Sequence, residues 1–406
     1  MKKKGKVFIH FTHPKRYSMS EKRSVLKYRI IMVIIAIATI PSIFVPINES
    51  YSEGTFVYVS NGEDGSISIL KLNQNTTDLD LVDKVPAGPK VMHMAVSPDH
   101  QLLYASIRSE PYSVLTYLIN THAGNLTQIG KVPLPANMVY ISTDNTGRFL
   151  LSVSYNEEMI AINPISSNGT VQPNPVQVIS TGEKPHSIRN DLSNQFVYVP
   201  HLGMSQIKQF IFDENNGTLI PNKPEGVRTN DNSGPRHIEF SPDNRFVYVS
   251  NEIDGTVSAY VLNNKTGILT EIQRLSAMPR NSNSQSVDID NVANAGESKP
   301  INLGVADIHI TPNGKWIYVS ERNSSTIAAF AVDSGSGYLT HIENYDTEKI
   351  PRGIGIDPKG NFLLAAGQES GYLSAYKINN ETGELMYLNR YESGKGPNWI
   401  EIVEFD

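Results

Sequence analysis

Short runs of apolar residues, broken at regular intervals by polar turns, organise most of this chain. One run, FVYVSNEIDGTVSAYVL, extends from Phe246 to Leu262, and its alternation predicts two strands joined by a tight turn. Similar runs begin at seven places: Phe56, Leu102, Phe149, Phe196, Phe246, Trp316 and Phe362. The steps between these residues are 46, 47, 47, 50, 70 and 46 residues, a spacing that suits the four-stranded blade of a β-propeller.

Two further strands complete each repeat. A short apolar strand and a turn come before the run, as in MHMAVSPD (Met92 to Asp99) and RHIEFSPD (Arg236 to Asp243). A loop such as NNKTGILT, followed by a last strand, comes after it. Each repeat therefore predicts four strands, and no long amphipathic helix interrupts them.

The two ends of the repeat region are complementary. The segment GPNWIEIVEF (Gly396 to Phe405) resembles GPRHIEFSP, yet no blade follows it, and the first run lacks such a strand before it. A ring in which the C-terminal strand becomes the inner strand of the first blade removes both open edges. We therefore predict an all-β fold, a single seven-bladed propeller with four-stranded blades over residues 51–406.

Two segments lie outside the repeat. The step of 70 residues contains an insertion near residues 280–300 that is rich in Asn, Ser and Asp. We interpret it as a flexible loop, and the alternative is a lid.

The second segment is the N-terminal one. Within residues 1–50, ten lysines and arginines precede the apolar run Ile30–Val45. This arrangement predicts a signal or anchor segment that exports the propeller to the periplasm or outer face of the membrane, with a cytoplasmic location as the alternative. We expect membrane contact only through this segment.

Composition narrows the possible chemistry. The net charge of −6 and a pI near 6.0 offer no basic field for nucleic acid. The absence of cysteine excludes disulfides, thiolate metal sites and a cysteine nucleophile. No serine-hydrolase elbow, zinc-protease motif or phosphate-binding loop occurs, and no histidine spacing supports a metal site.

Polar residues recur at two positions of the repeat that should meet at one rim of the ring. The start of the inner strand carries His186, Arg236, His237, Asp307 and Arg352, and the end of the second strand carries Arg108, Glu252, Arg322 and Gln368. Buried charges persist only if they pair, stay hydrated or bind a ligand, so both a structural network and a ligand site fit the pattern. Because neighbouring side chains of a strand point to opposite faces, we expect one of Arg236 and His237 to have a structural role.

Several motifs give the chain a resemblance to a known family. They are KPHS (Lys184 to Ser187), GPRH (Gly234 to His237), SNE (Ser250 to Glu252), ADIHITPNG (Ala306 to Gly314), SER (Ser320 to Arg322), PRG (Pro351 to Gly353), AAGQ (Ala365 to Gln368) and GPNW (Gly396 to Trp399). Together they resemble the seven-bladed lactonases, which include propeller-type 6-phosphogluconolactonase and carboxy-cis,cis-muconate cyclase. The resemblance implies catalytic roles for His186, Arg236, Glu252 and Arg322, with no cofactor and no metal.

The resemblance implies a lactone hydrolase of the 6-phosphogluconolactonase type, and we expect it to act as a monomer on a small lactone. Attack of water creates an oxyanion, for which Arg236 and Arg322 are the candidate donors, and either Glu252 or His186 could take the proton of the water. Substrate-binding candidates are Arg108, His237, Asp307, Arg352 and Gln368; Arg352 or Arg108 would hold a phosphate or carboxylate, and Asp307 would orient a histidine. The alternatives are a non-catalytic exported propeller that binds a protein or cell-wall partner, and a muconate-lactone cyclase.

Overall fold

The computed structural model describes residues 54–279 and 304–405, which belong to one compact unit. These residues form 28 strands and no helix, so no helix among them could cross a membrane. The predictions for residues 1–50 and for the insertion near 280–300 fall on residues outside the described part of the chain.

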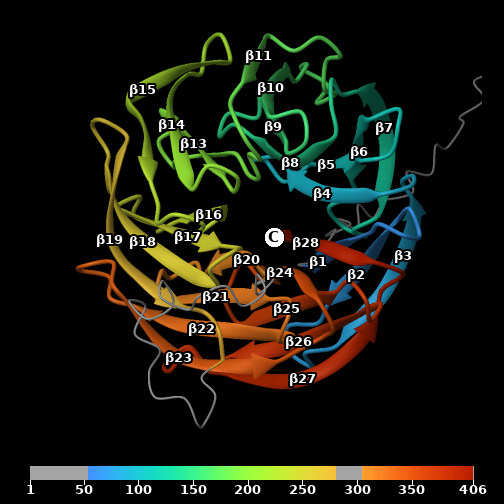
Figure 1. Ribbon diagram of the computed structural model, residues 1–406. Helices are drawn as coiled ribbons and strands as arrows, with labels where there is room; N and C mark the ends of the chain where they lie inside the picture. Colours follow the sequence, from blue (N-terminus) through green and yellow to red (C-terminus); the bar gives the residue numbers. More distant parts are fainter. Residues whose placement is uncertain (1–53, 280–303, 406) are drawn as a thin grey trace, which may run out of the picture. The chain divides into compact units, whose positions relative to one another are not determined.

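The strands form seven four-stranded antiparallel sheets arranged as blades around an axis (Figure 1). The innermost strands are β28 (Pro397–Phe405), β4 (Val91–Val96), β8 (Met138–Thr143), β12 (Arg189–Asn190), β16 (Pro235–Phe240), β20 (Val305–Ile310) and β24 (Pro351–Ile356). The second strands are β1 (Gly54–Asn61), β5 (Leu102–Ile107), β9 (Phe149–Ser154), β13 (Phe196–His201), β17 (Phe246–Asn251), β21 (Trp316–Glu321) and β25 (Phe362–Gly367). The predicted seven-bladed propeller is confirmed, and six second strands begin at the predicted residue.

The outer half of each blade completes the sheets. The third strands are β2 (Ser66–Leu72), β6 (Ser113–Ile119), β10 (Met159–Pro164), β14 (Gln206–Asp213), β18 (Thr256–Asn263), β22 (Thr326–Val332) and β26 (Tyr372–Ile378). The outermost are β3 (Leu79–Pro86), β7 (Leu126–Pro133), β11 (Gln177–Ser180), β15 (Thr218–Arg228), β19 (Ile268–Ser276), β23 (Leu339–Asp346) and β27 (Leu385–Glu392).

Burial follows the position of each strand in its blade. Every residue of β17 (FVYVSN) is buried, because a second strand packs against neighbouring blades on both of its faces. The outermost strand β3 (LDLVDKVP) exposes most of its side chains, since it has water on one side. The core therefore lies between blades rather than at a single centre.

A repeated hydrogen bond fastens one blade to the next. A tyrosine in the second strand donates its hydroxyl to a glycine carbonyl in a turn of the following blade, and the described pairs are Tyr58–Gly124, Tyr104–Gly169, Tyr198–Gly267, Tyr248–Gly337 and Tyr318–Gly383, at 2.8–3.2 Å. Glycine is required at these turns: Gly337 has φ +78°, and a Cβ atom there would come 2.2 Å from the ring of Phe246.

The last strand closes the ring. Strand β28 pairs antiparallel with β1, so that Val403 faces Phe56 and Ile400 faces Val59. The first blade is thus built from both ends of the repeat region, and no open edge is left at the axis. The predicted closure by the C-terminal strand is confirmed.

We predict that deleting residues 396–406 abolishes cooperative unfolding, because the first blade would lose its inner strand and expose the edge of β1. Thermal unfolding followed by circular dichroism and calorimetry would measure this. The matched control is Glu404→Ala, which removes only the ion pair of β28 with Lys359 and should cost less than about 1 kcal/mol. A truncated protein that melts like the full chain would contradict the role of β28.

Candidate active site

The inner strands share an irregularity at one height of the axis. The pairing register of an inner strand with its second strand shifts between Val91 and Met94, Met138 and Tyr140, Pro235 and His237, Val305 and Ile308, Pro351 and Gly353, and at Pro397 to Trp399. In the fourth blade, His186 lies between the isolated bridge Pro185–His201 and the start of β12. A bulge places an extra residue in the strand and redirects its side chain. Each blade therefore presents an irregular residue at this height.

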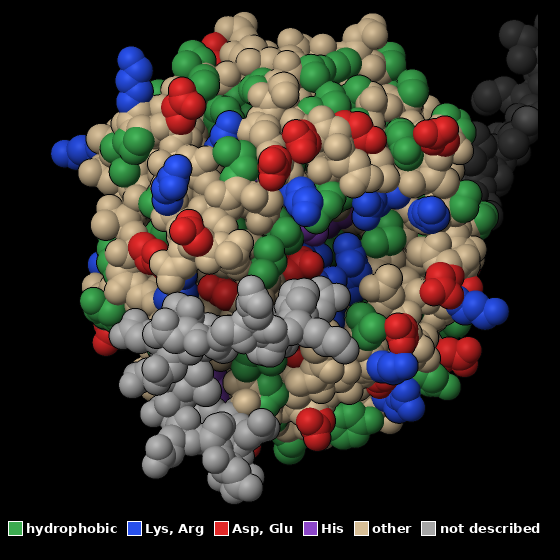
Figure 2. Space-filling view, in the orientation of Figure 1, with side chains coloured by type: hydrophobic (Ala, Val, Ile, Leu, Met, Phe, Trp, Pro, Cys, Tyr) green, Lys and Arg blue, Asp and Glu red, His purple; other side chains and the backbone are tan. Residues whose placement is uncertain are grey.

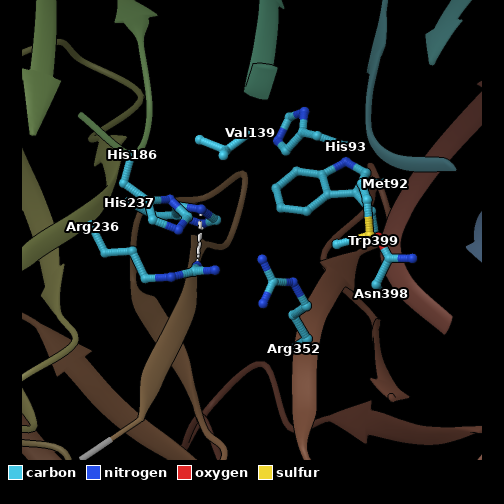
Figure 3. A pocket seen from close by; sticks show the side chains of 9 residues that line it. All are labelled: Met92, His93, Val139, His186, Arg236, His237, Arg352, Asn398 and Trp399. Carbon is cyan, nitrogen blue, oxygen red and sulfur yellow. Dashed lines mark hydrogen bonds between the residues drawn. The ribbon is translucent and has the colours of Figure 1, made fainter. Parts of the chain in front are cut away.

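These bulges surround a pocket on the axis. Its lining is Met92, His93, Val139, His186, Arg236, His237, Arg352, Asn398 and Trp399. The space-filling view shows a hollow at the centre of this face, with basic, acidic and histidine side chains visible in it (Figure 2). The residues come from six of the seven blades, and Figure 3 shows the guanidinium groups of Arg236 and Arg352 pointing toward one another across the pocket.

A glutamate joins two arginines beside the pocket. Arg236 Nε lies 2.8 Å from Glu252 Oε2, and Arg322 Nη2 lies 2.9 Å from Glu252 Oε1. The Arg236 side chain is only 2% exposed, and its Nη1 also donates to the Ala306 carbonyl at 2.8 Å. Burial would raise the pKa of Glu252, but the two arginines lower it overall. Glu252 is therefore ionised and fixes both guanidinium groups.

Arg352 adds a further positive charge to the pocket. Burial, reinforced by the charges of Arg236, Arg322 and Arg108, lowers its pKa to about 9, so the side chain remains protonated at neutral pH. Arg108 itself donates from Nε to Asn137 Oδ1 at 2.7 Å. Arg236, Arg322 and Arg352 thus surround Glu252. This excess of positive charge favours an anionic ligand or an anionic transition state.

The pocket histidines are uncharged at neutral pH. Burial and the nearby Arg236 lower the pKa of His237 to about 3, although Asp307 Oδ1 lies 2.8 Å from its Nδ1. Burial and Arg236 also hold the pKa of His186 well below 6.5. The Nδ1 atom of His186 is buried without a hydrogen-bond partner among the described residues. A neutral imidazole in this setting can accept a proton.

Three aromatic rings that line the pocket, those of His93, His237 and Trp399, pack with a fourth, Tyr140, that does not. The His93 ring lies 3.7 Å, centroid to centroid, from both Tyr140 and Trp399, and the His237 ring lies 5.3 Å and 5.7 Å from the same two rings. Trp399 Nε1 donates to Glu401 Oε1 at 2.7 Å, which fixes the plane of the indole.

The structure brings most of the residues predicted for the site together. Four of them line the pocket, namely His186, Arg236, His237 and Arg352. Glu252 and Arg322 reach it through their ion pairs, and Asp307 lies behind His237. Arg108 and Gln368 are half-buried and do not line the pocket. The sequence analysis did not choose His93, Asn398 or Trp399 as site residues, although they occupy the same repeat positions as Arg236 and His237.

One premise of the sequence analysis was wrong. Strand alternation was expected to send Arg236 and His237 to opposite faces, yet both line the pocket, and Arg236 Nη1 lies 2.9 Å from His237 Nε2. The reason is the register shift between Pro235 and His237, which interrupts the alternation at Arg236.

The donor set around the pocket does not suit a metal ion. Among residues 54–279 and 304–405, no group of three or more His, Asp or Glu side chains is arranged to hold a metal. Asp307 and Glu252 are occupied by histidine and arginine partners.

Comparison with known proteins identifies similar chains. Residues 51–402 match the family described as "Lactonase, 7-bladed beta-propeller". Proteins named 6-phosphogluconolactonase from Serratia proteamaculans and Yersinia enterocolitica are 35% and 34% identical over 300 residues, covering 74% of this chain and 84% of theirs. The solved periplasmic gluconolactonase of Pseudomonas aeruginosa is similar in fold, with a TM-score of 0.75 and 22% identity over 86% of this chain and 99% of that one.

Proposed function

Because the chain belongs to the seven-bladed β-propeller lactonase family, we propose that this lactonase opens a sugar lactone of the 6-phosphogluconolactone type by direct attack of water. The observation that carries the proposal is the excess of positive charge at the pocket, where Arg236, Arg322 and Arg352 lie around Glu252, while the nearby Asp307 is already paired with His309. Hydrolysis of a lactone passes through an oxyanion, and preorganised cationic donors stabilise that species most.

Arg236 and Arg322 are the proposed oxyanion donors. Their shared partner Glu252 holds both guanidinium groups in place before substrate arrives, so little reorganisation is needed during the reaction. Arg322 is further fixed by the bond from its Nε to the Gly304 carbonyl at 2.9 Å. The carbonyl oxygen of the lactone would lie between these donors.

His186 is the proposed general base. Glu252 is a poor candidate because both of its oxygens contact arginines, which lower its pKa. His237 is also engaged, by Asp307 at Nδ1 and by Arg236 at Nε2. His186 remains neutral at neutral pH and can take a proton from the attacking water. The hydroxide adds to the carbonyl carbon, the ring C–O bond then breaks, and the proton passes to the alkoxide.

Arg352 is the proposed anchor for a phosphate on the substrate, with Arg108 as a nearby second cation. Its guanidinium points into the pocket opposite Arg236 (Figure 3), where burial and the charges of neighbouring arginines lower its pKa, an effect that a bound dianion would oppose. Trp399 and His93, which line the pocket, offer ring surface to the C–H face of the sugar ring. The scheme needs no metal, because every step is assigned to a side chain of the chain.

The proposed place of action is outside the cytoplasm. Ten lysines and arginines precede the apolar run Ile30–Val45, and positive charge favours the inner side of the membrane. We expect external protease to degrade the propeller in spheroplasts of cells that express the full chain. Quantitative immunoblotting would measure this, with a cytoplasmic protein as control, and full protection in intact spheroplasts would point to a cytoplasmic enzyme.

We predict that Arg322→Gln lowers kcat on the cognate lactone about 10²- to 10³-fold, because an oxyanion donor is lost. Arg236→Lys, which keeps a charge but loses the planar fork, should lower kcat in the same direction. Initial rates, corrected for spontaneous hydrolysis, and thermal melts would be measured together. The control is Arg245→Gln, whose side chain is 50% exposed. Folded Arg322 and Arg236 variants with normal kcat would contradict the mechanism.

We predict that Arg352→Met lowers kcat/KM for a phosphorylated lactone about 10- to 100-fold, since a charge-assisted hydrogen bond is lost. The same variant should leave kcat/KM for the unphosphorylated lactone within about twofold. Arg108→Met, assayed in parallel, tests whether the second cation shares the phosphate. An equal loss on both substrates would show that Arg352 acts on the lactone ring and not on a phosphate.

A further inference from the structure

A row of three side chains, His237, Asp307 and His309, leads away from the pocket. His237 on β16 lines the pocket, and its Nδ1 lies 2.8 Å from Asp307 Oδ1 on β20. The other oxygen, Asp307 Oδ2, lies 3.3 Å from Nε2 of His309, two residues further along the same strand. Asp307 is thus shared between a pocket histidine and a histidine that does not line the pocket.

The orientation of Asp307 is fixed from several directions. Its residue is 1% exposed, and it also accepts backbone hydrogen bonds from Ile308 at Oδ1 and from Ile354 at Oδ2, at 3.1 and 3.0 Å. Burial alone would raise the pKa of Asp307, but His309 and the hydrogen bond from His237 hold it well below 3.8. The carboxylate is therefore ionised and can only accept hydrogen bonds.

His309 supplies the positive charge in contact with this carboxylate. Burial would lower the pKa of His309, yet Asp307 and Glu239 raise it to about 9. Glu239 Oε1 on β16 lies 3.6 Å from His309 Nδ1 and pairs with Arg189 of β12 at 3.0 Å. Glu401 of β28 also faces this group: burial raises its pKa to about 7, while His309 acts to lower it.

The ionised Asp307 determines the tautomer of His237. Because the carboxylate can only accept, the proton of neutral His237 must be on Nδ1, which leaves a lone pair on Nε2. Arg236 Nη1 donates to that Nε2 at 2.9 Å. A proton on Nε2 would instead face the N–H of the guanidinium and repel it. Arg236 Nη1 also lies 3.3 Å from Nδ1, so the tautomer of His237, together with Glu252 and the Ala306 carbonyl, helps to determine where the guanidinium of Arg236 lies.

We propose that His309 is a positioning residue for Arg236, acting through Asp307 and His237 from outside the pocket lining. The inference rests on the proposed function, in which Arg236 stabilises the oxyanion. The position of Arg236 then depends in part on His309 and on its neighbours Glu239 and Arg189. None of these three residues lines the pocket. Loss of the charge at His309 raises the pKa of Asp307, and a protonated Asp307 can donate to Nδ1 of His237 and so permit the other tautomer.

The test compares wild type with His309→Gln, which keeps a hydrogen-bond donor but removes the charge. Long-range ¹H–¹⁵N spectra of histidine rings report the tautomer of His237 in the protein without substrate. We expect only the Nδ1–H form in wild type and a mixture of both forms in the variant. The kcat should fall about tenfold with KM unchanged. Raising the pH through about 9 should lower kcat on an unphosphorylated lactone more in wild type than in the variant, because His309 loses its proton only in wild type, whereas Arg352 and Arg236, with pKa values of about 9 and about 10, titrate in both.

The control is His341→Gln on β23, which removes a histidine far along the blade from the axis. If His309→Gln does not fold, Glu239→Gln provides a second test, since it removes one of the two carboxylates that raise the pKa of His309 and should move the fall in kcat to lower pH. A folded variant with the wild-type His237 tautomer overturns the inference. A changed tautomer with normal kcat supports the link from His309 to His237 and contradicts the role of Arg236 in the proposed function.

Discussion

The buried charge of Arg236 is the constraint on which the rest of the site depends. An isolated guanidinium in a protein interior costs several kcal/mol, so every nearby group must compensate for it. Glu252 neutralises it from one side, the Ala306 carbonyl and His237 accept its hydrogen bonds from another, and Asp307 fixes His237. These partners come from the fifth and sixth blades, so the same interactions that satisfy Arg236 also join two blades at the axis.

The structural features of the repeat recur from blade to blade, whereas the residues that line the pocket differ between blades. Fully buried second strands and tyrosine-to-glycine bonds recur from blade to blade and hold the ring together. The register shift of the inner strands also recurs, at the height of the pocket, but the residue it presents differs: Met92, Val139, Arg236 and Arg352 are all in this position. A nearly symmetric ring therefore produces an asymmetric pocket, charged on one side and aromatic on the other.

The period of the repeat and the matching chain ends predicted the seven blades, the start of most second strands and the closure by β28. Counting within the repeat also predicted that Arg236, Glu252 and Arg322 would meet. Side-chain direction was harder to predict, because it depends on a one-residue register shift that leaves no mark in the apolar pattern. The shift in β16 turns both Arg236 and His237 into the pocket, and the corresponding shift in β28 occurs beside Trp399, which also lines it.

The most direct test of the central claim is the rate at which the wild-type chain opens 6-phosphoglucono-δ-lactone and glucono-δ-lactone, measured in a pH-stat with spontaneous hydrolysis subtracted. An arginine-rich pocket that acts on the carbonyl predicts turnover of lactone well above the spontaneous rate, a higher kcat/KM for the phosphorylated substrate, and no loss of activity with a chelator. If neither lactone is hydrolysed faster than in buffer, the charged pocket is a binding site and the catalytic account is wrong.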